Sequence, residues 1–184
     1  MEKELAKLIE ETTEFGKLIR SGKTDDQYLE GQTYKIITAA ADVYKRDDIK
    51  LYIPCYNNGV PGVYREAERN YIPVCTSIEE INKTGCSKFT ETNLKDLCSY
   101  LYDNINNYQL LSDPEVALKA GVSISDLTEY ADRNIKLEGF ILDPSSDHLF
   151  GFEGWELQAV MFKGMGVATF DVYDADTGEK KHEL

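Results

Sequence analysis

The sequence predicts an α+β fold in a single domain over residues 1–184. In this fold an N-terminal helical hairpin packs on a mostly antiparallel or mixed sheet, with further helices between the strands. Apolar residues recur at helical spacing over the first fifty residues, whereas short aromatic and β-branched runs begin after Lys50. Helical segments separate only some of those runs, which is typical of α+β proteins. The 184 residues, 42% of them hydrophobic, suffice for one buried core.

The first fifty residues are predicted to form two helices. Apolar residues between Leu5 and Ile19 lie three and four positions apart, and Gly22 offers the left-handed residue that ends a helix. Asp25 offers a capping oxygen for the next helix. The apolar face predicted for that helix comprises Tyr34, Ile37, Ala41 and Tyr44.

Two strands are predicted next, at Leu51–Tyr56 and Tyr71–Cys75. They share the sequence Tyr-Ile-Pro, and we expect them to pair as neighbours in one sheet. Because proline donates no backbone hydrogen bond, Pro54 and Pro73 each predict an edge, a bulge or a strand start. The segment between the strands, Gly62–Arg69, is predicted to be a loop or a short hairpin.

Helix signals follow in the middle of the chain. Ser77 and Glu80 have the spacing of a capping box, and Gly85 is placed to end that short helix. Thr92–Asn104 has one apolar stripe and is predicted to be an amphipathic helix. Two further helix starts are predicted, at Asp113–Glu115 and Ser125–Asp126.

The last fifty residues are predicted to contain mainly strands. Three strands are expected, at Ile135–Leu142, His148–Phe152 and Val167–Tyr173, and a fourth after the Asp174–Gly178 turn. The segment Trp155–Lys163 suits either a helix or a strand.

The charge balance limits the partners. With 20 basic and 33 acidic residues the net charge is −13, which argues against direct binding to nucleic acid or to an anionic membrane. Residues 1–99 carry −3 and residues 100–184 carry −10. No secretory leader or long apolar run is recognised, so we expect a cytoplasmic protein. The oligomeric state is left open.

No catalytic, cofactor or metal site is predicted. The two histidines are His148 and His182, and neither is near a cysteine in the sequence. The four cysteines are widely spaced, and no two of them form the Cys-x-x-Cys pair that is typical of a zinc site. They are Cys55, Cys75, Cys86 and Cys98. We expect them to be small buried hydrophobic residues, although a disulfide stays possible.

A partner-binding surface is predicted between Leu137 and Phe162, where five acidic residues occur without a lysine or arginine. The candidate residues are Glu138, Asp143, Asp147, Phe150, Phe152, Glu153, Trp155 and Glu156. Acidic groups of this kind steer a basic partner, and large aromatics anchor interfaces. The alternative is an ordinary solvated surface, with at least one of the aromatics in the core.

These features predict a non-enzymatic binding or regulatory protein that meets a protein partner through an acidic surface, with a basic protein as one option for the partner. One alternative is an inhibitor or immunity-type protein that blocks a basic nucleic-acid-binding site on its partner. A second alternative is an enzyme, which would need a pocket that brings His148 to a cysteine or carboxylate.

Part of the chain resembles a known family. Three blocks occur in order, at Leu51–Pro54, Tyr71–Ile81 and Leu137–Pro144. From residue 50 to about 150 their order and spacing resemble the SseB-like N-terminal domain. Cys75 stands where that family usually has phenylalanine, and Asp143 where asparagine is common. The resemblance implies an α+β fold in a bacterial cytoplasmic protein, sometimes associated with serine sensitivity or secretion, and it implies no catalytic residues.

Overall fold

A computed structural model describes residues 2–22, 25–55, 62–66, 69–105, 137–146, 150–167, 171–173 and 180–183. The helices are α1 (Lys3–Arg20), α2 (Asp26–Tyr44), α3 (Ile78–Lys83), α4 (Leu94–Ile105) and α7 (Gly154–Gly164). The strands are β1 (Leu51–Cys55), β2 (Tyr64–Glu66), β3 (Arg69–Val74), β4 (Lys88–Thr92), β5 (Leu137–Leu142), β6 (Phe150–Glu153), β7 (Asp171–Tyr173) and β8 (Lys180–Glu183).

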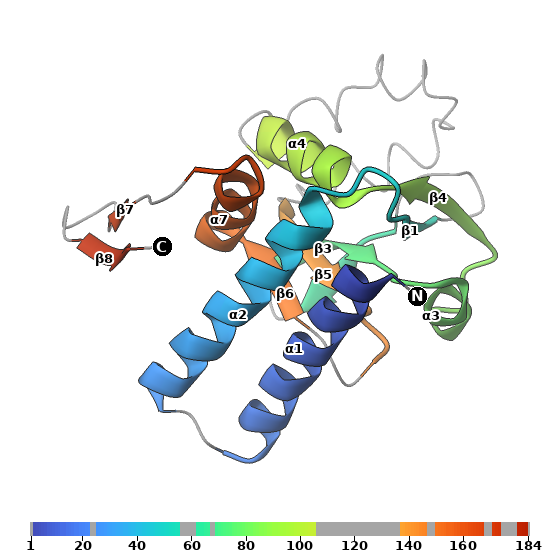
Figure 1. The fold of residues 1–184 in the computed structure, drawn as a ribbon. Helices are drawn as coiled ribbons and strands as arrows, with labels where there is room; N and C mark the ends of the chain where they lie inside the picture. The colour runs from blue at the N-terminus through green and yellow to red at the C-terminus, as the bar shows by residue number, and fades with distance from the viewer. Residues whose placement is uncertain are drawn as a thin grey trace.

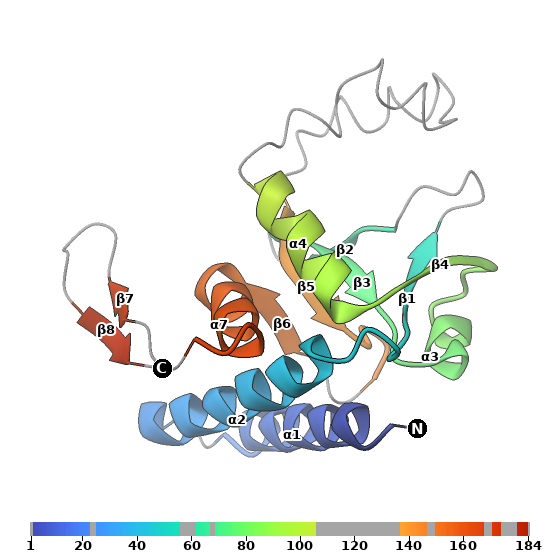
Figure 2. The same cartoon turned by 45° about the horizontal axis from the view of Figure 1, so that its top comes forward.

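The main sheet has four strands in the order β2-β3-β5-β6. β3 and β5 run parallel, whereas the β2–β3 and β5–β6 pairs are antiparallel. In both ribbon views the α1–α2 hairpin, α4 and α7 lie on one side of this sheet (Figures 1 and 2). The α+β fold with a helical hairpin on a mixed sheet is thereby confirmed.

Both helices of the hairpin follow the predicted stripes and caps. α1 buries Leu5, Leu8 and Thr12, and the chain leaves it through Gly22, which has φ +69°. The Asp25 side chain accepts a hydrogen bond from the amide of Gln27 at 3.0 Å and so caps α2.

The core lies between the sheet and the helices and is centred on phenylalanines. Phe140 of β5 and Phe152 of β6 stack with ring centroids 4.6 Å apart. Phe150 contacts Phe152 edge-to-face, and Phe15 of α1 contacts Phe150 in the same way at 5.0 Å. Each fully buried side chain of this size contributes about 1.5–3 kcal/mol, so this cluster fastens the hairpin to the sheet.

The predicted pairing of the two Tyr-Ile-Pro strands is wrong. β1 pairs along its whole length with β4, whose residues Lys88–Thr92 were not predicted to be a strand. Beyond the end of β3, Cys75 forms an isolated bridge with Tyr52 of β1, where each amide donates to the other carbonyl. β4 is exposed at four of its five positions, so it has none of the alternating burial that marks a strand in a sequence.

The segment before β3 forms the short hairpin that was expected. β2 pairs only with Arg69–Tyr71, so no β2 residue lies opposite Pro73. Proline has no amide proton, and it is tolerated at position 73 because no β2 residue lies there to accept a hydrogen bond from it.

The helix caps of the middle segment also follow the sequence. The Glu80 amide donates to the Ser77 hydroxyl at 3.2 Å, and Gly85 beyond α3 has φ +74°. α4 begins at Leu94, two residues later than predicted, because the Asn93 side chain caps it by accepting from the Asp96 amide at 2.8 Å.

Trp155–Lys163 is helical and lies within α7, which packs against α2. A Cβ at Gly164 would lie 2.3 Å from the Tyr44 ring, so the two helices touch closely there. Tyr34 was expected on the buried face of α2, but it is 43% exposed. The Lys163 ammonium lies 4.4 Å from its ring centroid, which is a cation–π contact at the surface.

The C-terminal strands β7 and β8 pair with each other in a separate sheet, beyond α7 in both views (Figures 1 and 2). Several predicted features lie outside the described residues: the helix starts at Asp113 and Ser125, His148, and the Asp174–Gly178 turn. Among the described helices, none has the length and apolar character needed to cross a membrane.

Candidate functional site

A polar cluster lies where β6 ends and α7 begins. Glu153, the last residue of β6, accepts a hydrogen bond from the Arg69 guanidinium at 2.8 Å and another from the Tyr71 hydroxyl. Arg69 and Tyr71 belong to β3, so the cluster joins two strands that are not neighbours in the sheet. The Glu153 side chain is 30% exposed, which leaves it partly accessible to solvent.

The cluster lies on the sheet face opposite the main core. Ile72, Phe140 and Phe152 face that core. Tyr71 and Glu153 occupy the alternate positions and therefore point to the other face. Gly139 of β5 pairs with Tyr71 on one side and with Glu153 on the other, and it carries no side chain. The absence of a side chain at Gly139 leaves this part of β5 open, so Tyr71 can reach across it to Glu153.

Burial keeps the Tyr71 hydroxyl protonated. Burial and, after it, the hydrogen bond with Glu153 raise the pKa of Tyr71 to about 12, while Arg69 opposes the increase. At neutral pH the tyrosine is therefore a hydrogen-bond donor, and Glu153 is its acceptor.

Glu156 is the second carboxyl group of this site. Glu153 occupies the N-cap position of α7, which places Glu156 at the third helical position. Burial and, to a lesser degree, the nearby charge of Glu153 raise the pKa of Glu156 to about 7. The backbone amides of Glu156 and Glu153, together with Arg69, favour the ionised form but do not offset the burial. Glu156 therefore titrates near neutral pH.

The structure separates the eight predicted surface residues into three groups. Asp143, Phe150 and Phe152 are buried, and the two phenylalanines belong to the core. Glu138, Glu153, Trp155 and Glu156 are half-buried. Asp147 lies outside the described residues. A buried side chain offers no contact to a partner in this fold, so only the half-buried group carries the binding hypothesis further.

Asp143 is buried and is held by hydrogen bonds within the fold. Its carboxylate accepts from the backbone amide and the hydroxyl of Thr76, at 2.8 and 2.7 Å. Its φ of +45° is unusual for a residue other than glycine. Asp143 thereby joins the carboxyl ends of the parallel strands β3 and β5.

Three of the cysteines are buried and Cys86 is half-buried; all four are free thiols. Burial raises the pKa of Cys75 and of Cys98 to about 12, so both stay protonated at neutral pH. Over the described ranges, no group of three or more histidine, cysteine or acidic side chains is arranged to hold a metal ion.

Arg69 and Tyr71 are the site residues that sequence reasoning missed. They lie 84 and 82 positions from Glu153, and no local pattern links residues so far apart. One available signal was Gly139 within the predicted strand Ile135–Leu142, since a glycine inside a strand indicates close approach of another group.

Scans of the chain against protein-family models, curated proteins and solved structures found no match. The function proposed below therefore rests on the residues and contacts of this chain.

Proposed function

We propose that this chain is a non-enzymatic binding or regulatory protein of the bacterial cytoplasm. It contacts a protein partner through Glu138, Glu153, Trp155 and Glu156, here called the β6–α7 surface. The observation that carries the proposal is the grouping of Glu153, Trp155 and Glu156, all half-buried, around one turn between a strand and a helix.

Trp155 is suited to an interface because one part of its side chain is buried and another part is accessible to solvent. Its side chain packs partly against the core and is half-buried. Tryptophan held rigidly by its own fold and flanked by polar groups is typical of the residues that dominate binding energy. A partner that covers the accessible part of Trp155 would gain apolar contact. The entropy cost would be small, because Trp155 is already packed against the core.

The flanking carboxylates favour a basic partner. Arg69 already pairs with Glu153, so a lysine or arginine of the partner would provide a positive charge beside Glu156, and it could also stack on Trp155. The net charge of −13 would steer such a partner at long range, and salt would weaken that steering.

The test compares two double variants that each replace two glutamates with glutamines, in different places. Glu138→Gln with Glu156→Gln alters the β6–α7 surface. Glu10→Gln with Glu79→Gln alters exposed residues of α1 and α3, and α3 lies on the side of the molecule away from α7 (Figure 1). Partner capture from lysate, quantified by mass spectrometry at low salt and at 1 M salt, is the readout.

We expect several-fold less capture by the first pair and unchanged capture by the second. Equal losses in both pairs would mean that only net charge matters, and that result would contradict the proposed surface. Capture that is unchanged at 1 M salt would contradict the electrostatic part. Competition by duplex DNA for the captured partner would favour the inhibitor or immunity-type alternative.

We also infer that residues 50 to about 150 form an SseB-like domain. Support comes from β3, which leads through Thr76 and Ser77 into α3, and from β5, which is followed by Asp143-Pro144 and pairs with β3 in parallel. Crystallographic comparison of the strand order with that of an SseB-like domain tests the inference, and a different order of the central strands would contradict it.

A further inference from the structure

We propose that the open edge of β4 pairs with the same edge of a second copy of this chain, in antiparallel register about Thr90. The two β1–β4 sheets then form one continuous sheet around a two-fold axis. This self-association uses a different surface from the partner contact proposed above. The observation that carries it is the direction of the backbone groups of the β4 residues Phe89 and Glu91.

β1 has two edges, and hydrogen bonds show which of its residues serve each one. The Tyr52 amide donates to the Cys75 carbonyl at 2.9 Å, and the Cys75 amide donates to the Tyr52 carbonyl at 2.7 Å. The backbone groups of successive residues point to alternate edges of a strand. The edge of β1 that faces β4 is therefore served by the other set of residues, namely Leu51, Ile53 and Cys55.

The same alternation leaves one edge of β4 open. The partners of those three β1 residues are Thr92, Thr90 and Lys88, so Phe89 and Glu91 turn their amides and carbonyls away from β1. Among the described residues, no strand pairs with β4 on that edge. β4 lies at the margin of the molecule, with β1 between it and β3 (Figures 1 and 2). Its first four residues are exposed, so another strand can reach the edge.

The two residues that face the open edge are complementary to themselves. When Thr90 lies opposite Thr90 of the second copy, Phe89 lies opposite Glu91 of the second copy, and the reverse pair forms across the two-fold axis. Directly opposed residues of this kind exchange both of their N–H···O bonds in an antiparallel ladder. All the outward amides and carbonyls of Phe89 and Glu91 thereby gain partners. The register uses one surface patch on both copies, as a two-fold symmetric interface requires.

The side chains of β4 also suit this register. Lys88 lies opposite Thr92 of the second copy and Glu91 lies opposite Phe89, so no like charges face each other directly. Glu91 is already paired with Lys50 of its own chain, which reduces the repulsion between the two Glu91 carboxylates. Phe89 is 40% exposed, and the two Phe89 rings come within diagonal reach of each other, where aromatic contact is favourable.

The assembly closes at two copies. Its outer strands are both β1, whose outer edge is already bonded through Tyr52 to Cys75 and so adds no further strand there. β4 has only 5 residues, which makes the interface short and the association weak. Each copy has a net charge of −13, so added salt should strengthen the dimer by screening the repulsion. This salt dependence is opposite to that expected for capture of a basic partner.

Sedimentation velocity of the full-length protein over a concentration series measures the association. Thr90→Lys and Thr90→Glu each place like charges opposite each other on the two-fold axis, so each variant alone should associate several-fold more weakly than the wild type. An equimolar mixture of the two should restore association, because lysine then lies opposite glutamate. Gln27→Lys and Gln27→Glu make the same charge changes at an exposed position of α2, and we expect them to leave the association unchanged.

Three results would overturn the proposal. The first is a wild type that stays monomeric at every concentration. The second is unaltered association in both position-90 variants. The third is a mixture of these variants that associates as weakly as its components.

Hydrogen exchange of the wild type gives a readout that needs no variant. The Phe89 and Glu91 amides face the open edge, so their protection should rise several-fold as the protein concentration increases. The Thr90 amide faces β1 and should be protected at every concentration. Equal exchange of the Phe89 and Glu91 amides at low and high concentration would overturn the paired edge.

Discussion

Asp143 and Thr76 form a two-point junction between the parallel strands of the sheet. The Asp143 carboxylate accepts from the Thr76 amide at 2.8 Å and from the Thr76 hydroxyl at 2.7 Å, across 67 positions of sequence. The Asp143 amide in turn donates to the Val74 carbonyl at 2.7 Å. All of these groups are buried, so each hydrogen bond replaces one that water would otherwise make.

Replacing Asp143 should therefore destabilise the fold to a degree that depends on the substitute. Asp143→Ala leaves the buried Thr76 donors without an acceptor, at a cost of about 1–3 kcal/mol, and it also strains a backbone with φ +45°. Asp143→Asn keeps one acceptor oxygen and tolerates that backbone conformation, so it should cost much less. Urea denaturation of both variants measures the difference. Equal losses would refute the junction.

Gly139 should not tolerate a side chain. Its Cβ would lie 1.9 Å from the Phe152 carbonyl oxygen, so Gly139→Ala must separate β5 from β6 and should cost about 3 kcal/mol. Gly31→Ala is the matched control, because no atom lies within 4 Å of that Cβ in α2. The control should gain about 0.5–1 kcal/mol from helix propensity. Thermal denaturation of both proteins tests the opposite signs.

The phenylalanine cluster should account for a large share of the stability. Phe152 is fully buried against Phe140, so Phe152→Ala should lower the free energy of unfolding by about 3–5 kcal/mol. Phe162→Ala removes the same ring from a position that is 36% exposed and should cost clearly less. If both variants unfold at the same denaturant concentration, the core assignment of Phe152 fails.

The thiols should differ in reactivity in the native protein. With pKa values of about 12, Cys75 and Cys98 stay protonated at pH 8 and should resist iodoacetamide. The half-buried Cys86 should be alkylated first. Peptide mass spectrometry of timed samples gives the order, and denaturant should make all of the sites react. Early alkylation of Cys98 in folded protein would contradict its burial.

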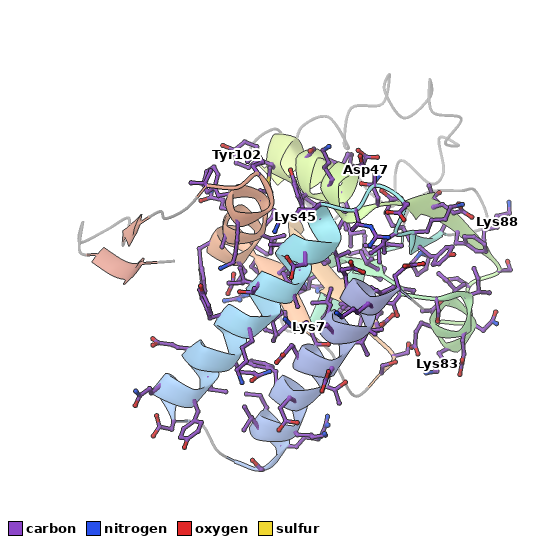
Figure 3. All side chains as sticks on the ribbon, in the orientation of Figure 1. Lys7, Lys45, Asp47, Lys83, Lys88 and Tyr102 are labelled. Carbon is purple, nitrogen blue, oxygen red and sulfur yellow. The ribbon has the colours of Figure 1, made fainter. Side chains whose placement is uncertain are left out.

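The acidic residues described between Leu137 and Phe162 are not the charges that are most exposed on the surface of this protein. Figure 3 shows Lys83 and Lys88 on α3 and β4, at the edge of the molecule away from α7. The acidic residues described between Leu137 and Phe162 are all buried or half-buried. Net charge per segment, read from the sequence, therefore overstates how acidic the β6–α7 surface is.

Local structure followed closely from local sequence. Ser77 and Asp25 cap their helices as their residue types predict, and Gly22 and Gly85 take the left-handed conformations expected of them. These features depend on interactions within about four residues, so a short stretch of sequence contains all the partners involved.

The sequence predicted the wrong neighbour for strand β1. The shared Tyr-Ile-Pro motif suggested that β1 and β3 are neighbours, yet β1 pairs with the exposed β4. Side-chain alternation reports which face of a strand is buried, but it does not report which other strand supplies the backbone hydrogen bonds. The helical periodicity of α1 and α4 carried no such ambiguity, because a helix satisfies its own backbone.

By itself, the sequence determined the α+β class, the helical hairpin and most of the caps and strands, because each follows from side-chain periodicity or from a backbone preference of one residue. Tertiary structure alone decided that Asp143, Phe150 and Phe152 are interior residues, and that Arg69 and Tyr71 come to Glu153. The physical reason is that burial and charge pairing depend on which distant segments pack together, and the raised pKa of Glu156 is a product of that packing.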